Sequence, residues 1–508
     1  MGTLKTFQLN FITNKPLIRW LQILNEFEKN TCCNANDLAI LTESTSRTIG
    51  KDICQIRDYF EDSITIESTH QGYVFKQLKL VTYEEKKTAL LIDEPLFLIL
   101  EKIFFAELYT LDDWSDQLHL SKTTLLKYLK KIQSQLVYFD LDITYDPVNI
   151  IGQEADKRHF FCTFFYESEI TPHTVFPSIS AQQTVNEIGS LFKNDCYRNT
   201  SFFLYTYLLY ISVERFMQGN TVKVNNQLRN ALNDRMQQVH FKKINDVIEK
   251  FYDIRLPDDE LIFLFCCIIS QRKMSDITVE KQFCFTYNQW PESKLLAEEF
   301  LNILDSSYEN KTITLIFLEA FFITAKLKEY LCISANRNTQ DINRFIQKMF
   351  PYECHMYQKF LESNKNYHSL YSDEFLVDFS CSLVLHIETI RERYWKNKKN
   401  IAFIFEGNNH IIQFIEATSN NYLMDDHCVF YPNASEVNKK YLIENKIDIL
   451  ITNYPEHVEE FQSEAECILF RSIPSASDWN RLLEKINPKI TNQYFLADKT
   501  NFSSYLYE

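Results

Sequence analysis

Glycine and proline are scarce in this chain, which has 7 glycines and 12 prolines among 508 residues. Both residues interrupt helices, so their scarcity excludes collagen-like and linker-dominated proteins and favours an ordered, mostly helical one. The 13 cysteines include no Cys-x-x-Cys pair and follow no regular spacing. We therefore expect reduced, mostly buried thiols in a cytoplasmic protein, with neither a metal site nor a cofactor.

Long apolar runs are also missing. No stretch approaches the ~18 consecutive apolar residues of a membrane span, and the first residues lack the apolar run of a signal peptide. Positive charge is in deficit too, because 53 Lys and Arg face 68 Asp and Glu, for a net charge of −15. Since non-specific phosphate binding grows with the number of cationic contacts, any DNA binding must come from local basic patches.

Residues 118–135, LHLSKTTLLKYLKKIQSQ, form such a patch. Ser121 is a plausible helix N-cap, and apolar residues follow at helical spacing at Leu125, Leu126, Leu129 and Ile132. Lys122, Lys127, Lys130 and Lys131 lie mostly off that apolar stripe, and no acidic residue occurs between Leu118 and Phe139. The pattern predicts a DNA-recognition helix, with a surface helix carrying solvated lysines as the alternative.

The pattern of the first 80 residues predicts a second, smaller DNA-recognition unit. Residues 16–29 and 35–41 have the apolar spacing of two helices, and the Ser/Thr/Arg cluster at 42–47 precedes a third, TIGKDICQIRDYF. The segment ITIESTHQGYVF then alternates, turns at His70-Gln71-Gly72 and resumes as a strand. This is the pattern of a winged helix-turn-helix, the alternative being a small α+β module without a ligand.

The same plan recurs further along the chain. Helices are expected at 94–106, 111–118 and 121–135, with two short strands around Asp146-Pro147. Two such units in tandem would read a long or bent DNA site. The candidate DNA-contacting residues are Ser46, Arg47, Lys51, Arg57, Ser121, Lys122, Thr123, Thr124, Lys127, Lys130 and Lys131.

A family resemblance becomes specific in this second unit. LSKTTLLKYLKKIQSQL and LDITYDPVNIIGQEADKRHFF resemble the helix-turn-helix of the Mga family of virulence regulators. They are also similar to the N-terminal modules of bacterial regulators that carry phosphotransferase-system regulation domains. In those relatives Ile-x-Gly-x-Glu, followed by an arginine, closes the wing, and the segment 151–154 with Arg158 fits that pattern.

A first helical block follows the polar segment 171–180, which we expect to be a linker. Residues 202–217 are nearly all apolar or aromatic and predict a fully buried helix. Together with LPDDELIFLFCCIISQ, they resemble the first regulation domain of the family. The phosphorylated relatives carry histidines seven residues before the arginine and after the glutamate, where this chain has Leu208 before Arg215 and Cys267 after Glu260. The resemblance therefore implies a structural or assembly unit without phosphorylation.

A second helical block ends in FLVDFSCSLVLHIETIRERY, where His386 stands seven residues before Arg393. This spacing matches the His-x6-Arg pattern that the first block lacks, and implies phosphorylation of His386 by a sugar phosphotransferase relay. A neutral imidazole is a good nucleophile for a phosphoryl group, and the added charge beside Arg391 or Arg393 could reorganise a helix interface. The alternative is a packed histidine hydrogen-bonded to a neighbour.

Strands and helices alternate in the last hundred residues. Strands are expected at IAFIFE, HCVFY, IDILITN and CILFRSI, and helices at 409–421, 437–444 and 477–486. Such alternation predicts a parallel sheet flanked by helices. It resembles enzyme IIB of the phosphotransferase system, whose catalytic cysteine follows the first strand. Here the loop 406–410 has no cysteine, so thiolate chemistry is excluded. His410 is an alternative acceptor that we do not favour, and an oligomerisation platform is expected instead.

The order of these units is that of the Mga/AtxA type of regulator. The resemblance implies a multidomain, mainly α fold with two N-terminal winged helix-turn-helix units, two helical bundles and a C-terminal α/β domain with a parallel sheet. The expected boundaries are 1–80, 81–165, 175–285, 286–396 and 400–508.

The function that the resemblance implies is a transcription regulator, usually an activator, and not an enzyme. Its expected partners are double-stranded promoter DNA, a second copy or higher oligomer of itself, and phosphocarrier proteins of the sugar phosphotransferase system, with no membrane. Two alternatives remain open. One is an RNA-binding antiterminator with regulation domains, and the other is a phosphocarrier enzyme.

Overall fold

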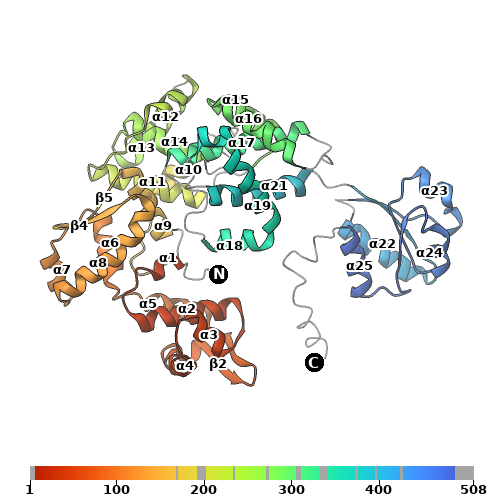
Figure 1. Ribbon diagram of the computed structural model, residues 1–508, viewed down its shortest axis with the longest axis horizontal. Coiled ribbons are helices and arrows are strands. Elements are labelled where there is room, and N and C mark those ends of the chain that lie inside the picture. Colours follow the sequence, from red (N-terminus) through yellow and green to blue (C-terminus); the bar gives the residue numbers. More distant parts are fainter. Residues whose placement is uncertain are drawn as a thin grey trace. The chain divides into compact units, whose positions relative to one another are not determined.

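Helices make up most of the first unit of the chain, Met1–Ile390, and a parallel sheet marks the second, Arg391–Glu508 (Figure 1). The computed structural model describes residues 6–166, 170–191, 202–232, 235–270, 274–304, 311–331, 340–371, 376–394, 398–423 and 427–486. The predicted fold class, a multidomain and mainly α protein with a C-terminal parallel sheet, is confirmed.

The N-terminal part of the first unit, after the short helix α1 (Thr6–Leu9), has the element order of a winged helix-turn-helix. Its elements are α2 (Lys15–Lys29), β1 (Cys32–Cys33), α3 (Ala35–Leu41), α4 (Ser46–Phe60), β2 (Ile64–Thr69) and β3 (Gly72–Gln77). The strands form an antiparallel sheet in the order β1-β3-β2. Gly72 has φ +136°, and a Cβ there would lie 2.4 Å from the carbonyl oxygen of Cys33. The start of β3 can therefore approach β1 this closely only with glycine at this position.

A second set of elements repeats this order, but it has no strand between α6 and α7, the helices that correspond to α2 and α3. It comprises α5 (Leu80–Ala89), α6 (Pro95–Phe104), α7 (Leu111–Gln117), α8 (Lys122–Leu136), β4 (Asp142–Tyr145), β5 (Val148–Ile151) and α9 (Glu154–Tyr166). The segment before α7 still meets the wing, because the amide of Val148 donates to the carbonyl of Tyr109 at 2.8 Å. The apolar face of α8, formed by Leu125, Leu129, Ile132 and Leu136, is buried in a core that also contains α6 and α9 residues.

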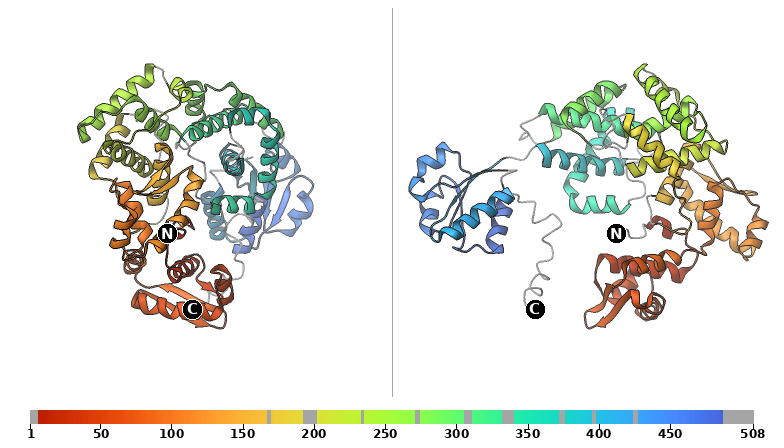
Figure 2. Two further views of the ribbon diagram at one scale, coloured as in Figure 1. Left: turned by 60° about the vertical axis from the view of Figure 1, so that its left-hand side comes forward. Right: turned by 180° about the vertical axis from the view of Figure 1, so that it is seen from behind.

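The rest of the first unit is helical. Its helices are α10 (Ile179–Leu191), α11 (Phe202–Met217), α12 (Asn226–Ala231), α13 (Arg235–Tyr252), α14 (Asp258–Ser270), α15 (Ile277–Tyr287), α16 (Pro291–Ile303), α17 (Lys311–Tyr330), α18 (Gln340–Met349), α19 (Pro351–Ser363), α20 (Lys365–Leu370) and α21 (Leu376–Tyr394). The boundary expected after residue 285 falls inside α15, which packs against α17. Ala320, Ile323 and Leu327 of α17 share one core cluster with α11 and α14, so the two expected bundles are joined through their interiors (Figure 2).

The segment predicted as a linker at 171–180 is packed in place, so that prediction was wrong. His173 is buried, with Nδ1 2.7 Å from Glu101 Oε2 and Nε2 3.0 Å from the carbonyl oxygen of Ile92. Thr171 and Thr174 are buried too, and the amide of Thr171 donates to the hydroxyl of Thr174 at 2.8 Å. The polar side chains looked like a solvated connection in the sequence, but their partners here allow burial.

The second unit is a four-stranded parallel sheet with helices on both faces. Its elements are β6 (Asn400–Ile404), α22 (Asn409–Leu423), β7 (Cys428–Phe430), α23 (Lys439–Glu444), β8 (Ile449–Thr452), α24 (Pro455–Phe461), β9 (Glu466–Leu469) and α25 (Ala476–Ile486). The strand order is β7-β6-β8-β9. One core lies between the sheet and α22 and α25, and the other lies under α23 and α24.

The sequence pattern does not indicate a helix between the third and fourth strands of this sheet. Helix α24 fills that gap, because two adjacent parallel strands need a crossover connection.

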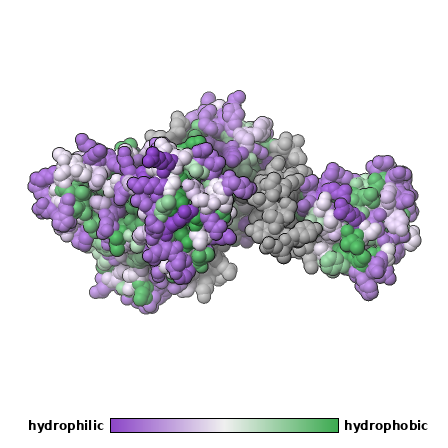
Figure 3. Space-filling view, turned by 90° about the horizontal axis from the view of Figure 1, so that it is seen from below, coloured by the Kyte–Doolittle hydropathy of each residue, from purple (hydrophilic) through white to green (hydrophobic). Residues whose placement is uncertain are grey.

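Polar residues predominate on the face of the molecule shown in Figure 3, and apolar side chains appear there only in small groups.

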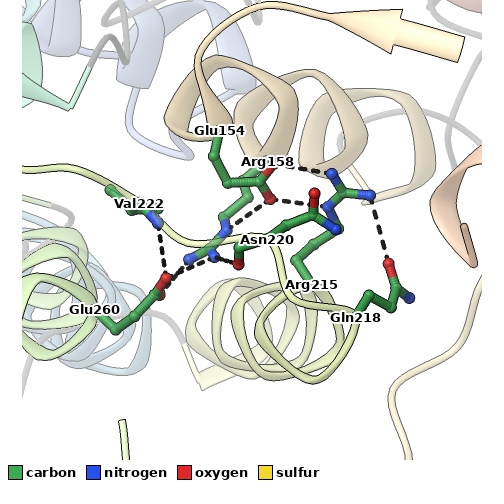
Figure 4. Close-up of polar contacts among 7 residues, drawn as sticks. All are labelled: Glu154, Arg158, Arg215, Gln218, Asn220, Val222 and Glu260. Atoms are coloured by element: carbon green, nitrogen blue, oxygen red, sulfur yellow. Dashed lines mark hydrogen bonds and ion pairs between the residues drawn. The ribbon is translucent and has the colours of Figure 1, made fainter. Parts of the chain in front are cut away.

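Four buried charged residues connect the second winged unit with the first bundle (Figure 4). Arg158 of α9 contacts both carboxylate oxygens of Glu260 on α14, at 2.6 and 2.9 Å. Arg215, near the end of α11, contacts both oxygens of Glu154 at 2.8 Å each. Arg158 Nε also donates to Glu154 at 3.2 Å, so the two pairs form one chain of contacts, called the buried ion network below.

The buried ion network is electrically balanced and almost fully shielded from solvent. Arg158 and Glu260 are 1% and 0% exposed. The amide of Val222 also donates to Glu260 at 2.8 Å, and Arg158 also donates to the carbonyl of Asn220 at 3.3 Å. Burial by itself would raise the pKa of Glu154, but hydrogen bonds and charge from Arg215 and Arg158 lower it below its ordinary value. The Glu154 carboxylate is therefore expected to be ionised at neutral pH.

We expect Glu260→Gln to destabilise the first unit strongly, because it leaves Arg158 buried without its full counter-charge. The expected loss is about 3–5 kcal/mol of unfolding free energy, measured by urea titration. The matched control is Glu187→Gln, which breaks an exposed pair with Lys250 at 2.6 Å and should cost about 1 kcal/mol or less. Equal losses in the two variants would show that the network is not a stabilising constraint.

Candidate nucleic-acid interface

Helix α4 presents a polar, cationic N-terminal end. The hydroxyl of Thr45 caps the helix by accepting from the amide of Thr48 at 3.2 Å, while Ile49, Ile53, Ile56 and Phe60 are buried underneath. Arg47 and Lys51 are exposed, and neither takes part in an ion pair within the described residues. Ser46 is exposed as well, and its hydroxyl donates to Asn36 on α3 at 2.7 Å. This end of α4 can therefore offer two cations to a phosphate backbone.

The orientation of α4 is set by contacts at its sides. Arg19 of α2 holds Asp52 through two hydrogen bonds of 2.8 and 3.1 Å, and Asp52 is 2% exposed. Arg57, predicted as a DNA contact, is half-buried and donates to Ser68 on β2 at 3.2 Å. The structure thus places Arg57 between the helix and its wing, away from the helix end that carries Arg47.

Helix α8 has the N-cap that the sequence predicts. The hydroxyl of Ser121 accepts from the amide of Thr124 at 3.2 Å, and the hydroxyls of Thr123 and Thr124 lie 2.9 and 2.8 Å from it. The threonines and serine thus form a hydroxyl cluster at the start of the helix. Lys127 and Lys130 are exposed on the polar face and form no ion pair among the residues that the structure describes.

The other two lysines of α8 are committed to the protein. Lys122 forms an ion pair with Asp112 on α7, which lies just outside the acid-free stretch from Leu118 to Phe139. Lys131 donates to the carbonyl oxygen of Ile12 at 2.8 Å, and burial lowers the pKa of Lys131. Glu94, beside it, is buried and accepts from the amide of Thr13 at 2.6 Å. Lys131 therefore joins the segment before α2 to α8, and its contact with DNA stays a prediction.

Sequence reasoning missed these two partners for different reasons. The short turn between α7 and α8 was a usable signal for the pair of Lys122 and Asp112, since it places the two helices side by side. No local signal could have found the contact of Lys131 with Ile12, which are 119 positions apart.

His386 lies on α21 at the wall of a small cavity. Its Nε2 is 3.0 Å from the carbonyl oxygen of Phe317, and its ring is 4.9 Å from the ring of Phe321. The cavity has a volume of about 280 Å³, and its lining includes His386, Ser382, Lys328 and Glu280. Because a carbonyl oxygen can only accept, Nε2 carries a proton, and in the neutral ring the lone pair is on Nδ1.

In the second unit, the loop after β6 borders a polar cavity of about 470 Å³. Asn408 caps α22 by accepting from the amide of His410 at 2.9 Å, and Glu406 and Glu416 are among the lining residues. His410 is exposed and is not part of the lining. Two carboxylates at this cavity disfavour a phosphate, and the loop has no thiol that could carry one.

The part of the chain that the structure describes contains no group of three or more His, Cys, Asp or Glu side chains that could hold a metal ion. Within the same residues, none of the helices is both long enough and apolar enough to cross a membrane.

Comparison with known proteins connects this geometry to a family. Residues 79–165, from α5 to α9, match the Mga helix-turn-helix domain. The capsule synthesis positive regulator AcpB of Bacillus anthracis is 22% identical over 81% of this chain and 84% of its own length. A putative trans-acting regulator of Streptococcus pneumoniae serotype 4 is 21% identical over 87% of this chain and 92% of its own. The chain thus carries a Mga helix-turn-helix domain, and its similarity over most of its length to proteins named as regulators supports a DNA-binding transcription regulator of the Mga/AtxA type.

Proposed function

We propose that this regulator activates transcription by contacting promoter DNA with the exposed ends of α4 and α8. The observation that supports this is the placement of Arg47, Lys51, Lys127 and Lys130, which stay exposed and unpaired among the described residues of a chain whose net charge is −15. These four cations lie on the second helix of each helix-turn-helix, the element that enters the major groove in such units. The relatives named as positive regulators favour activation over repression.

The proposed binding mode relies on phosphate contacts and DNA shape. Helix α8 offers Lys, Ser and Thr side chains at its exposed positions, and these serve phosphates better than they identify bases. Four cations are too few to hold DNA strongly at physiological salt. We therefore propose that the protein acts as a homodimer or higher oligomer assembled through its second unit, so that several heads bind together.

Replacing both Lys127 and Lys130 by alanine should weaken binding to all duplex sequences alike. The salt dependence of log K should flatten by about one for each lysine that contacts a phosphate. Fluorescence anisotropy with labelled promoter duplex at several salt concentrations measures both effects.

Two controls separate this role from general charge loss. Lys122→Ala should have a smaller effect, because Lys122 is already paired with Asp112. Lys440→Ala, in an exposed i,i+4 pair with Glu444 on α23, should have none. Unchanged affinity in the double variant would remove α8 from the interface. Tighter binding to a hairpin RNA than to duplex DNA would support an antiterminator instead.

We propose that His386 is the acceptor through which a phosphotransferase relay tunes the activity. Its Nε2 donates to the carbonyl of Phe317, and in the neutral ring this tautomer has the basic lone pair on Nδ1. The adjoining cavity of about 280 Å³ can accommodate a phosphoryl group, and Lys328 is among its lining residues. A phosphorylated ring would bring negative charge to the packing of α21 against α17.

His386→Ala should abolish phosphoryl transfer to the protein from a reconstituted phosphocarrier relay with a labelled donor. The label should be lost in acid, because phosphorus is bound to nitrogen. His368→Ala is the matched control, since His368 is exposed and its Nε2 lies 2.8 Å from the backbone carbonyl of Glu362, much as Nε2 of His386 lies 3.0 Å from that of Phe317. Label that persists without His386 would contradict the proposal, and onward transfer to a sugar would indicate a phosphocarrier enzyme.

A further inference from the structure

A cavity of about 410 Å³ in the first bundle is lined by residues of α12, α13, α14 and the turns that follow α12 and α13. Its volume falls within the range of small-molecule sites. The apolar lining residues are buried and are called the floor below. They are Leu232, Phe241, Leu261 and Ile262.

The exposed lining residues, called the rim below, are mainly cationic. Among the described residues that line the cavity, the rim has three cations, Arg229, Lys242 and Arg255, and one carboxylate, Asp258. This local excess of positive charge contrasts with the net charge of −15 of the whole chain. The rim therefore favours an anion over a cation as the ligand.

The two rim arginines are held by carboxylates that lie outside the cavity lining. Arg229 forms an ion pair with Asp259 at 2.6 Å. Arg255 pairs with Asp246 and Glu249 at 3.0 and 2.6 Å. None of these three carboxylates is among the described lining residues. Because a guanidinium has five N–H donors, each arginine keeps donors for a ligand while its position is restrained.

Lys242 is the rim cation that has no carboxylate partner among the residues that the structure describes. It follows the floor residue Phe241 on α13, and Asn245 comes one turn later. The buried side chain of Asn245 accepts from the amide of Leu256 and donates to its carbonyl, both at 2.9 Å. This double hydrogen bond fixes the turn between α13 and α14, so the wall of the cavity is formed without a ligand.

We propose that this cavity binds a small organic anion, a carboxylate or a phosphate monoester with an apolar part. The charged group meets Lys242 and the two arginines, and the apolar part covers the floor. The proposal depends neither on the DNA contacts nor on the phosphorylation proposed above.

The position of the cavity connects it with the buried ion network. Asp258 and Leu261 line the cavity, and Glu260, which holds Arg158, belongs to the same first turn of α14. A ligand that binds the folded cavity should therefore stabilise this turn and raise the melting temperature of the protein.

The test is isothermal titration calorimetry of the full-length protein at constant ionic strength with four probes, phenyl phosphate, benzoate, inorganic phosphate and benzyl alcohol. Phenyl phosphate or benzoate should bind at least about tenfold more tightly than inorganic phosphate, which lacks the apolar part, and than benzyl alcohol, which lacks the charge. The tighter of the two organic anions identifies the preferred charged group. Absence of binding by both, or equal binding by inorganic phosphate or benzyl alcohol, would overturn the proposal.

A pair of neighbouring lysines locates the binding site. Lys242→Met removes the charge but keeps most of the side-chain length, and should weaken binding of the organic anion about tenfold. The matched control is Lys243→Met, which changes the next residue of α13, exposed and outside the lining, and should leave the affinity unchanged. Equal affinities of the two variants would place the ligand elsewhere and refute the assignment.

A measurement on the unsubstituted protein gives the same answer without a variant. Acetylation of lysines by an N-hydroxysuccinimide ester, followed by peptide mass spectrometry, compares Lys242 with Lys243. The bound organic anion should slow acetylation of Lys242 and leave that of Lys243 unchanged. Acetylation of Lys242 at the same rate with and without the saturating ligand would contradict the proposal.

Discussion

The first unit depends on a simple electrostatic constraint, which is that two buried arginines require two buried carboxylates. Separating Arg158 from Glu260, or Arg215 from Glu154, would leave a charge in a dry interior and cost several kcal/mol. Because Arg158 and Glu154 directly follow the second wing, whereas Arg215 and Glu260 belong to α11 and α14, this part of the DNA-binding region stays attached to the bundle. The packed segment around His173 adds a second attachment, on α6.

The same constraint gives new roles to residues that mark phosphorylation sites in similar regulators. Arg215 and Glu260 occupy the motif positions around Leu208 and Cys267, which cannot accept a phosphoryl group as histidine does. In this chain Arg215 and Glu260 are paired with Glu154 and Arg158 in the buried ion network. The first bundle is thus joined to the second winged unit through buried charges, while His386, the phosphoryl acceptor that we propose, lies on α21.

The small number of unpaired cations limits how the proposed DNA-binding face can hold phosphates. An acidic chain has few cations to spare, and two of the four lysines on α8 are used within the protein, Lys122 on Asp112 and Lys131 on the segment before α2. Lys127 and Lys130, which form no ion pair in the described part of the chain, are the lysines of that helix that we propose for phosphate contact. This division favours weak individual heads whose binding is strengthened by assembly, and it makes the affinity sensitive to the state of the whole molecule.

Local sequence determined the elements. The spacing of apolar residues predicted α3 and α11 with their observed ends, Ser121 was the N-cap of α8, and the alternation around Gly72 predicted the first wing, because these features depend on neighbours within a few positions. Only the tertiary structure decided which charges are paired, that Thr171 and residues 173–175 are buried, and that α15 packs across the expected boundary. These outcomes depend on residues far apart in the chain, and a buried polar group is recognisable only once its partner is known.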